Sequence, residues 1–186
     1  LVCDAEWSNK AKDGREKEIR RCISCMEGCI NQITYGRALR CALNPEAGVE
    51  CLSAYDKKPD TSKSVMVIGA GPGGMQAAVT AAERGHKVVV LEKEHKLGGQ
   101  LNIAHVPPMK YRLNWITEWY ENEMNRLGVD VRMGTEATIG LVKELNPDVV
   151  IVATGAKPSV PPINGIEHTV SSWNVLDGTA DIVENS

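Results

Sequence analysis

The sequence lacks any long hydrophobic run, because its uninterrupted apolar stretches cover only a few residues each. A membrane-spanning helix needs about 20 apolar residues, and the N-terminus shows no apolar core of a secretory signal. The chain also lacks an excess of positive charge, since 21 Lys and Arg are interspersed with 24 Asp and Glu. We therefore expect a cytoplasmic protein that binds neither membranes nor nucleic acid.

Internal repeats and low-complexity tracts are also missing. The 186 residues have room for one ordinary domain with an appendage. The chain opens on Leu1 rather than Met, and no closing secondary-structure element is predicted after Asp181. From these features we expect a part of a longer protein.

The segment from Val65 to Glu92 predicts a βαβ unit. A β-branched run at 65–68 stops at glycine, an Ala-rich helical pattern covers about 72–84, and a second apolar run at 88–91 ends on an acid. Further on, the pattern predicts an amphipathic helix at 109–127, a strand at 129–133, a short helix at 139–145 and a buried parallel strand at 148–155. The predicted fold class is therefore α/β with a Rossmann-like dinucleotide-binding unit.

The turn between the first strand and the helix carries the spacing G-x-G-x-x-G at Gly69, Gly71 and Gly74. The first glycine permits the tight turn, the second lets the backbone approach a pyrophosphate, and the third lets the helix pack against the strand. Phosphates would then face the positive end of the helix dipole. Glu92 follows about 20 residues later, where a carboxylate binds ribose hydroxyls and disfavours a 2′-phosphate.

Four of the six cysteines, Cys22, Cys25, Cys29 and Cys41, have the spacing C-x2-C-x3-C-x11-C. In a cytosolic protein such a set is typical of metal ligation rather than of disulfides. Three crowded thiolates and a fourth from a later loop suit an iron–sulfur cluster. The same donors also suit a structural zinc ion, and thiols without metal are a third reading. Cys3 and Cys51 lie outside the pattern and are expected to be ordinary thiols.

Together, the cysteine segment and the glycine fingerprint resemble the NADH:flavin oxidoreductase family, which includes 2,4-dienoyl-CoA reductase, 2-enoate reductase and trimethylamine dehydrogenase. Further matching motifs are D-A-E-W at 4–7, N-P at 44–45 and G-G-Q-L at 98–101. Arg21 departs from the pattern, because relatives commonly have proline there, and we expect it to alter a local turn rather than ligation. The resemblance covers nearly the whole chain.

The resemblance implies a larger architecture. In that family a TIM barrel carries FMN and the substrate, a [4Fe–4S] segment follows, and an FAD domain with an inserted NAD(P)H domain completes the chain. This sequence resembles the middle: a barrel exit and cluster segment at 1–60, an incomplete FAD domain at 61–170 and a crossover toward the NAD(P)H domain at 171–186. Its expected partners are the barrel and NAD(P)H domains, NADH and a small-molecule substrate. Considered alone, residues 1–20 also fit a disordered arm.

The resemblance also assigns the site residues. No catalytic side chain is expected within this chain. The expected metal ligands are the four cysteines named above. The expected FAD contacts are Gly69, Gly71, Gly73, Gly74, Glu92, Lys93, Gly99, Gln100, Leu101, Lys110, Ala137, Ala153, Thr154 and Gly155.

The function predicted from the sequence is electron transfer from NADH through FAD and the cluster to FMN, for reduction of an unsaturated acid or thioester. One alternative is an amine dehydrogenase of the same architecture with ADP in place of FAD. Another is a zinc-stabilised dinucleotide-binding module with a regulatory role.

Overall fold

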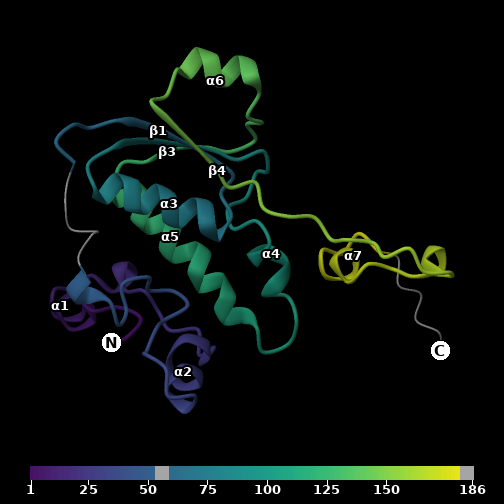
Figure 1. Cartoon of the computed structure of the whole chain (residues 1–186), viewed down its shortest axis with the longest axis horizontal. Helices are drawn as coiled ribbons and strands as arrows, with labels where there is room; N and C mark the ends of the chain where they lie inside the picture. Colours follow the sequence, from purple (N-terminus) through teal and green to yellow (C-terminus); the bar gives the residue numbers. More distant parts are fainter. Residues whose placement is uncertain (53–58, 181–186) are drawn as a thin grey trace.

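The computed structural model describes residues 1–52 and 59–180 and contains a parallel four-stranded sheet (Figure 1). The strands lie in the order β3-β2-β1-β4, and every neighbouring pair is parallel. Their bounds are Ser64–Ile68 for β1, Lys87–Leu91 for β2, Asp130–Arg132 for β3 and Val149–Val152 for β4. A parallel sheet with helical crossovers confirms the predicted α/β fold.

Two helices cover one face of this sheet and form the core with it (Figure 1). Helix α3 (Pro72–Glu83) connects β1 to β2, and α5 (Asn114–Arg126) packs on α3 before the chain enters β3. Met75 and Val79 of α3 and Met124 of α5 are fully buried. The predicted amphipathic stripe of the second helix therefore faces the core, as its spacing indicated.

The remaining elements are short. They are α1 (Trp7–Lys12), η1 (Glu16–Glu18), the π-helical turn η2 (Glu27–Asn31), α2 (Gln32–Thr34), η3 (Glu50–Leu52), α4 (Leu101–Ala104), η4 (Tyr111–Leu113), α6 (Ile139–Leu145), η5 (Ile166–His168) and α7 (Ser172–Leu176). Helix α6 lies on the opposite side of the sheet from α3 and α5, and α7 belongs to an arm that leads away from the sheet (Figure 1).

Two expectations from the sequence need correction. The helix predicted at 109–127 begins at Asn114, because Tyr111–Leu113 form a separate 3-10 turn after the two prolines. The strand predicted as buried, β4, is exposed, with exposed fractions of 36% for Val149, 40% for Val150 and 71% for Val152. It lies at the end of the sheet order and pairs with β1. Helix α3 packs mainly over β1 and β2, so the side chains of β4 are less covered than its apolar run predicted.

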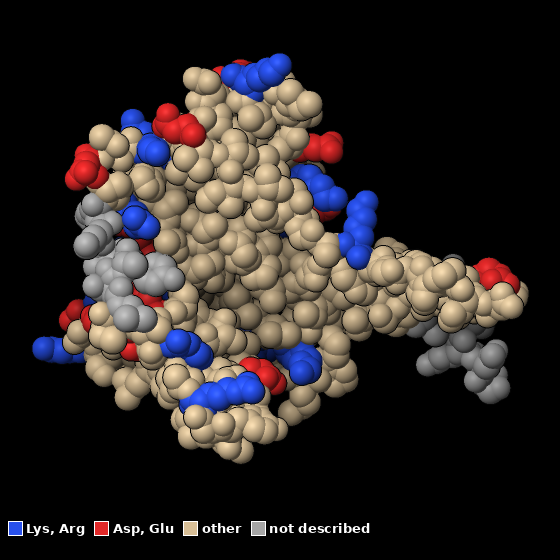
Figure 2. Space-filling model, viewed as in Figure 1, with Lys and Arg blue, Asp and Glu red and all other residues tan. Residues whose placement is uncertain are grey.

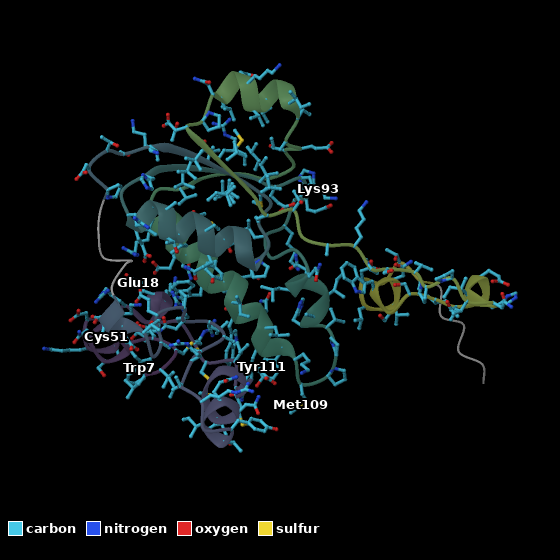
Figure 3. The ribbon with its side chains drawn as sticks, viewed as in Figure 1. Trp7, Glu18, Cys51, Lys93, Met109 and Tyr111 are labelled. Atoms are coloured by element: carbon cyan, nitrogen blue, oxygen red, sulfur yellow. The ribbon has the colours of Figure 1, made fainter. Side chains whose placement is uncertain are left out.

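The N-terminal segment is folded onto α5 rather than extended as a free arm. The indole Nε1 of Trp119 donates a hydrogen bond to the Glu18 carbonyl oxygen (2.9 Å), and the Arg20 guanidinium lies 3.9 Å from the centre of the Trp119 ring. Figure 3 shows Glu18 beside the helical layer. Ile23 and Leu43 also pack against the core. These contacts attach the cysteine segment to the dinucleotide-binding unit.

Figure 2 shows charged side chains of both signs around the rim of this face, with a broad uncharged area between them. In the described part of the chain, no helix has the length and the apolar character needed to cross a bilayer.

Candidate functional site

The glycine fingerprint forms a tight turn between β1 and α3. Gly69 has a φ of +102°, which favours glycine, and its N–H donates to the Leu91 carbonyl oxygen of β2 (2.8 Å). A β-carbon at Gly74 would lie only 1.9 Å from the Gly69 carbonyl oxygen. By contrast, β-carbons at Gly71 and Gly73 would meet no atom within 4 Å. The first and third glycines therefore close the turn, and the space beside Gly71 and Gly73 is open.

This open space lies at the N-terminus of α3, a helix of 12 residues with Gly71 at its N-cap and no side-chain cap. Uncapped N–H groups and the helix dipole both favour an anion at this position. The residues present therefore fit the pyrophosphate of a dinucleotide, with room for the ligand backbone and donors that face it.

Glu92 lies directly after β2 and is buried, with 7% of the residue exposed. One carboxylate oxygen accepts a hydrogen bond from the Ala70 N–H (2.6 Å), and the other accepts from the Glu94 N–H (2.9 Å). A carboxylate has about four acceptor sites, so acceptor capacity remains for ribose hydroxyls. The structure adds a role that the sequence did not indicate, because Glu92 also holds the glycine turn in place.

Replacing Glu92 with glutamine is expected to lower the free energy of unfolding by about 1–3 kcal/mol and to weaken FAD binding at least tenfold. The carboxylate has two acceptor oxygens and the amide has one, so the NH2 group would face the N–H of Ala70 or of Glu94 and leave that donor unpaired. Urea unfolding and titration with FAD measure the two effects. The matched control is Glu94→Gln, since the Glu94 carboxylate is exposed and its ion pair with Lys93, at 3.5 Å, is exposed as well. Equal effects of the two substitutions would contradict this role of Glu92.

A second glycine loop lies against the fingerprint. The Gly98 N–H donates to the Ala70 carbonyl oxygen (2.9 Å), and a β-carbon at Gly99 would lie 3.2 Å from the Gly71 α-carbon. The Gln100 side-chain amide donates to the Ala156 carbonyl oxygen (3.1 Å). The loop at 98–100 is therefore fixed between the fingerprint and the chain that leaves β4.

The turn after β4 completes this edge of the sheet. The Ala153 N–H donates to the Ile68 carbonyl oxygen (2.8 Å), and the Ala153 carbonyl oxygen lies where a β-carbon at Gly69 would clash, 2.4 Å away. Thr154 and Gly155 follow directly and are exposed. Most of the predicted FAD contacts thus gather at the carboxyl ends of the parallel strands, where α/β proteins bind ligands.

Four of the predicted contacts lie further out. Lys93 is exposed, and Leu101 opens α4 and packs partly on the core. Lys110 precedes η4, and Ala137 lies in the loop between β3 and α6. Among the described residues, no side-chain hydrogen bond or ion pair joins these four to the glycine turn, and their assignment stays a prediction.

The cysteine segment has an unusual backbone. Ser24 and Met26, on either side of Cys25, have φ values of +58° and +57°. The Ser24 N–H donates to the Cys22 sulfur (3.4 Å), and the Leu43 N–H donates to the Cys41 sulfur (3.4 Å). Amide donors of this kind stabilise ligand thiolates and tune the potential of iron–sulfur clusters.

The later loop that carries Cys41 lies directly against the cysteine triplet. A β-carbon at Gly28 would lie 2.8 Å from the Cys41 α-carbon, and the Arg40 N–H donates to the Gly28 carbonyl oxygen (2.6 Å). The backbone therefore brings the fourth cysteine beside Cys29, as a cluster requires. Within residues 1–52 and 59–180, however, no three His, Cys, Asp or Glu side chains converge closely enough to hold one metal ion. The four-cysteine ligand set stays a prediction.

Cys3 also lies near this segment. Burial, together with the nearby Cys41 and Cys22 side chains, raises the pKa of the Cys3 thiol to about 12. Cys51 is exposed and has no disulfide partner among the described cysteines.

Sequence reasoning missed the polar contacts between the cysteine segment and the start of α5. Arg21 pairs with Glu118 and lies 4.6 Å from the centre of the Trp115 ring. Arg112 donates a hydrogen bond to the Ser24 hydroxyl. The partners are separated by 88 to 97 residues, so no local pattern indicated them. The one hint in the sequence was Arg21, where the family resemblance led us to expect proline.

Known proteins resemble the chain in sequence and in structure. An NADH oxidase of Thermoanaerobacter brockii is 46% identical over 183 residues, which covers 96% of this chain and 28% of that protein. A bilirubin reductase of Mediterraneibacter gnavus is 42% identical and covers 95% of this chain and 28% of its own length. A solved 2-naphthoyl-CoA reductase superposes with a TM-score of 0.93 at 34% identity, over 98% of this chain and 28% of that one.

The chain thus spans little more than a quarter of the length of these relatives. The family model that matches covers residues 63–185 and is described as pyridine nucleotide-disulphide oxidoreductase. This family description implies an FAD-type flavin site, in agreement with the glycine turn. The relatives confirm the predicted resemblance to NADH:flavin oxidoreductases. The chain belongs to the pyridine nucleotide-disulphide oxidoreductase family.

Proposed function

We propose that this chain is the electron-transfer segment of an NADH-dependent iron–sulfur flavoprotein. The observation that carries the proposal is the attachment of a four-cysteine segment to the α5 face of an FAD-type unit. Trp119 and Arg20 make this attachment, together with the apolar side chains of Ile23 and Leu43. A fixed spacing between two redox groups suits electron transfer, whereas a binding module would not need it.

In this proposal the FAD lies along the carboxyl ends of β1, β2 and β4. The N–H groups at the start of α3 bind the pyrophosphate, and Glu92 accepts hydrogen bonds from the ribose. The loop that carries Gly99 and Gln100 lines the path toward the flavin ring. Bound FAD would supply the conversion of a two-electron hydride donor into single-electron steps.

The four cysteines hold a [4Fe–4S] cluster in this proposal. Three of these cysteines lie within eight residues and the fourth comes from a later loop. This spacing is typical of an iron–sulfur segment, whereas zinc sites more often have two separated C-x2-C pairs. The amide donors to Cys22 and Cys41 favour thiolate ligands. A cluster fits these features better than zinc does.

The substrate and FMN would be bound by a TIM barrel elsewhere in the complete protein, and NADH by a further domain. Large apolar side chains around the cysteine segment are exposed, which suits a surface that another domain covers. These residues are Met26, Ile30, Ile33, Tyr35, Met109 and Tyr111. The similarity to 2-naphthoyl-CoA reductase supports an unsaturated thioester or acid as substrate. Because the ligands are reduced thiols, we also propose a cytoplasmic location.

An anaerobic visible spectrum of the purified protein tests the proposal, with iron, sulfide, zinc and extracted nucleotide assayed on the same sample. We expect broad absorbance near 400 nm, about four irons per chain and FAD. ADP in place of FAD would favour the amine dehydrogenase alternative. A colourless protein with zinc would overturn the electron-transfer function and favour the regulatory module.

A further inference from the structure

Arg112 connects the dinucleotide-binding unit to the cysteine segment at one particular residue. It lies in η4, two residues after Lys110, and its guanidinium donates a hydrogen bond to the Ser24 hydroxyl. Ser24 stands between Cys22 and Cys25, and its own N–H donates to the Cys22 sulfur. The side chain of Arg112 therefore holds the residue whose backbone bonds a ligand sulfur.

In the described parts of the chain, Arg112 forms no ion pair with a carboxylate. Its recorded partners in the described parts of the chain are the Ser24 hydroxyl and the rings of Tyr111 and Trp115, whose centres both lie 5.8 Å from the guanidinium carbon. The neighbouring Arg21, in contrast, pairs with Glu118. Arg112 thus presents a net positive charge beside the cysteine loop. Figure 3 shows Tyr111 at the end of α5 that lies beside α2.

Reduction adds one negative charge to an iron–sulfur cluster, and a fixed cation nearby stabilises the reduced form. A hydrogen bond that orients the loop around a ligand acts in addition, because contacts behind the ligands tune a metal site. Arg112 belongs to η4, which leads directly into α5 of the dinucleotide-binding unit. One side chain of that unit therefore contacts the cysteine loop.

We propose that Arg112 is a positioning residue for the cluster, which fixes the cysteine loop through Ser24 and raises the tendency of the cluster to accept an electron. The inference rests on the proposed function, since it requires a cluster at Cys22, Cys25, Cys29 and Cys41. It goes beyond that function, because it assigns the tuning of the cluster to a residue outside the cysteine segment.

The test is a redox titration of the cluster in the complete protein with its cofactors, followed by electron paramagnetic resonance under anaerobic conditions. At the midpoint potential of the wild type, Arg112→Gln is expected to lower the ratio of reduced to oxidised cluster about tenfold, which is 59 mV for one electron. Arg112→Lys keeps the charge, and a smaller decrease is expected. The matched control is Arg132→Gln, because Arg132 is exposed on β3 and pairs with Asp130. It should titrate as the wild type does.

An Arg112→Gln protein that retains its cluster and titrates with the wild type would overturn the inference. Should this variant lose its iron, Ser24→Ala provides the second measurement, since it removes the acceptor and leaves the charge. We expect Ser24→Ala to lose iron in air several times faster than the wild type, and an equal rate would overturn the positioning role. A wild type without iron and sulfide would instead refute the proposed function itself.

Discussion

Replacing Gly74 with alanine is expected to lower the free energy of unfolding by about 3 kcal/mol and to abolish FAD binding. The added methyl group would lie 1.9 Å from the Gly69 carbonyl oxygen and 3.2 Å from the Ala153 β-carbon. The first of these atoms belongs to the backbone, so no flexible side chain can move away. Helix α3 must therefore shift from β1, and the turn that faces the pyrophosphate opens with it. Urea unfolding and the FAD content of the purified protein measure the two effects.

Gly73→Ala is the matched control for stability. Its added methyl group would meet no atom within 4 Å, its φ is not positive, and alanine favours a helix by up to about 1 kcal/mol over glycine. We expect the free energy of unfolding to stay the same or to rise. If Gly74→Ala were as stable as Gly73→Ala, the close packing of α3 against the glycine turn would not exist in solution.

The central βαβ unit was predictable because its signals are local. The glycine spacing, Pro72 in the first turn of α3 and the two β-branched runs all indicate the same structure within 28 residues of chain. The elements found, β1, α3 and β2, end within one residue of the predicted bounds. The gathering of the predicted FAD contacts follows from the topology, since parallel strands place their carboxyl ends at one edge.

The remaining features depend on contacts between distant parts of the chain. An apolar run such as that of β4 predicts burial, but only the sheet order shows that it is an edge strand with exposed valines. Likewise, the pattern of α5 did not indicate that the Trp119 indole donates a hydrogen bond to the carbonyl oxygen of Glu18, 101 residues away. The backbone bonds of Glu92 were hidden for the same reason, because Ala70 approaches it only after the sheet has formed.

Replacing Cys25 with serine is expected to remove most of the iron and sulfide and the absorbance near 400 nm. Cys25 lies between two residues with positive φ, which restrict the backbone around it to one loop conformation. A serine hydroxyl is a poor substitute for a thiolate toward iron, and the cluster would lose one of its four ligands. Iron and sulfide assays with an anaerobic spectrum measure the loss.

Cys51→Ser is the control, because Cys51 is an exposed cysteine outside the four-residue pattern. This variant should keep the iron, sulfide and colour of the wild type. The pair of variants also distinguishes a zinc site from an iron–sulfur cluster. A zinc site would lose about one zinc per chain in Cys25→Ser and would contain no sulfide in any sample. If both variants had the same iron content per chain, Cys25 would not be a ligand of the cluster. The open Gly71 region should bind FAD in both, because the cysteine loop is held by η4 and α5, through Ser24 and Arg21.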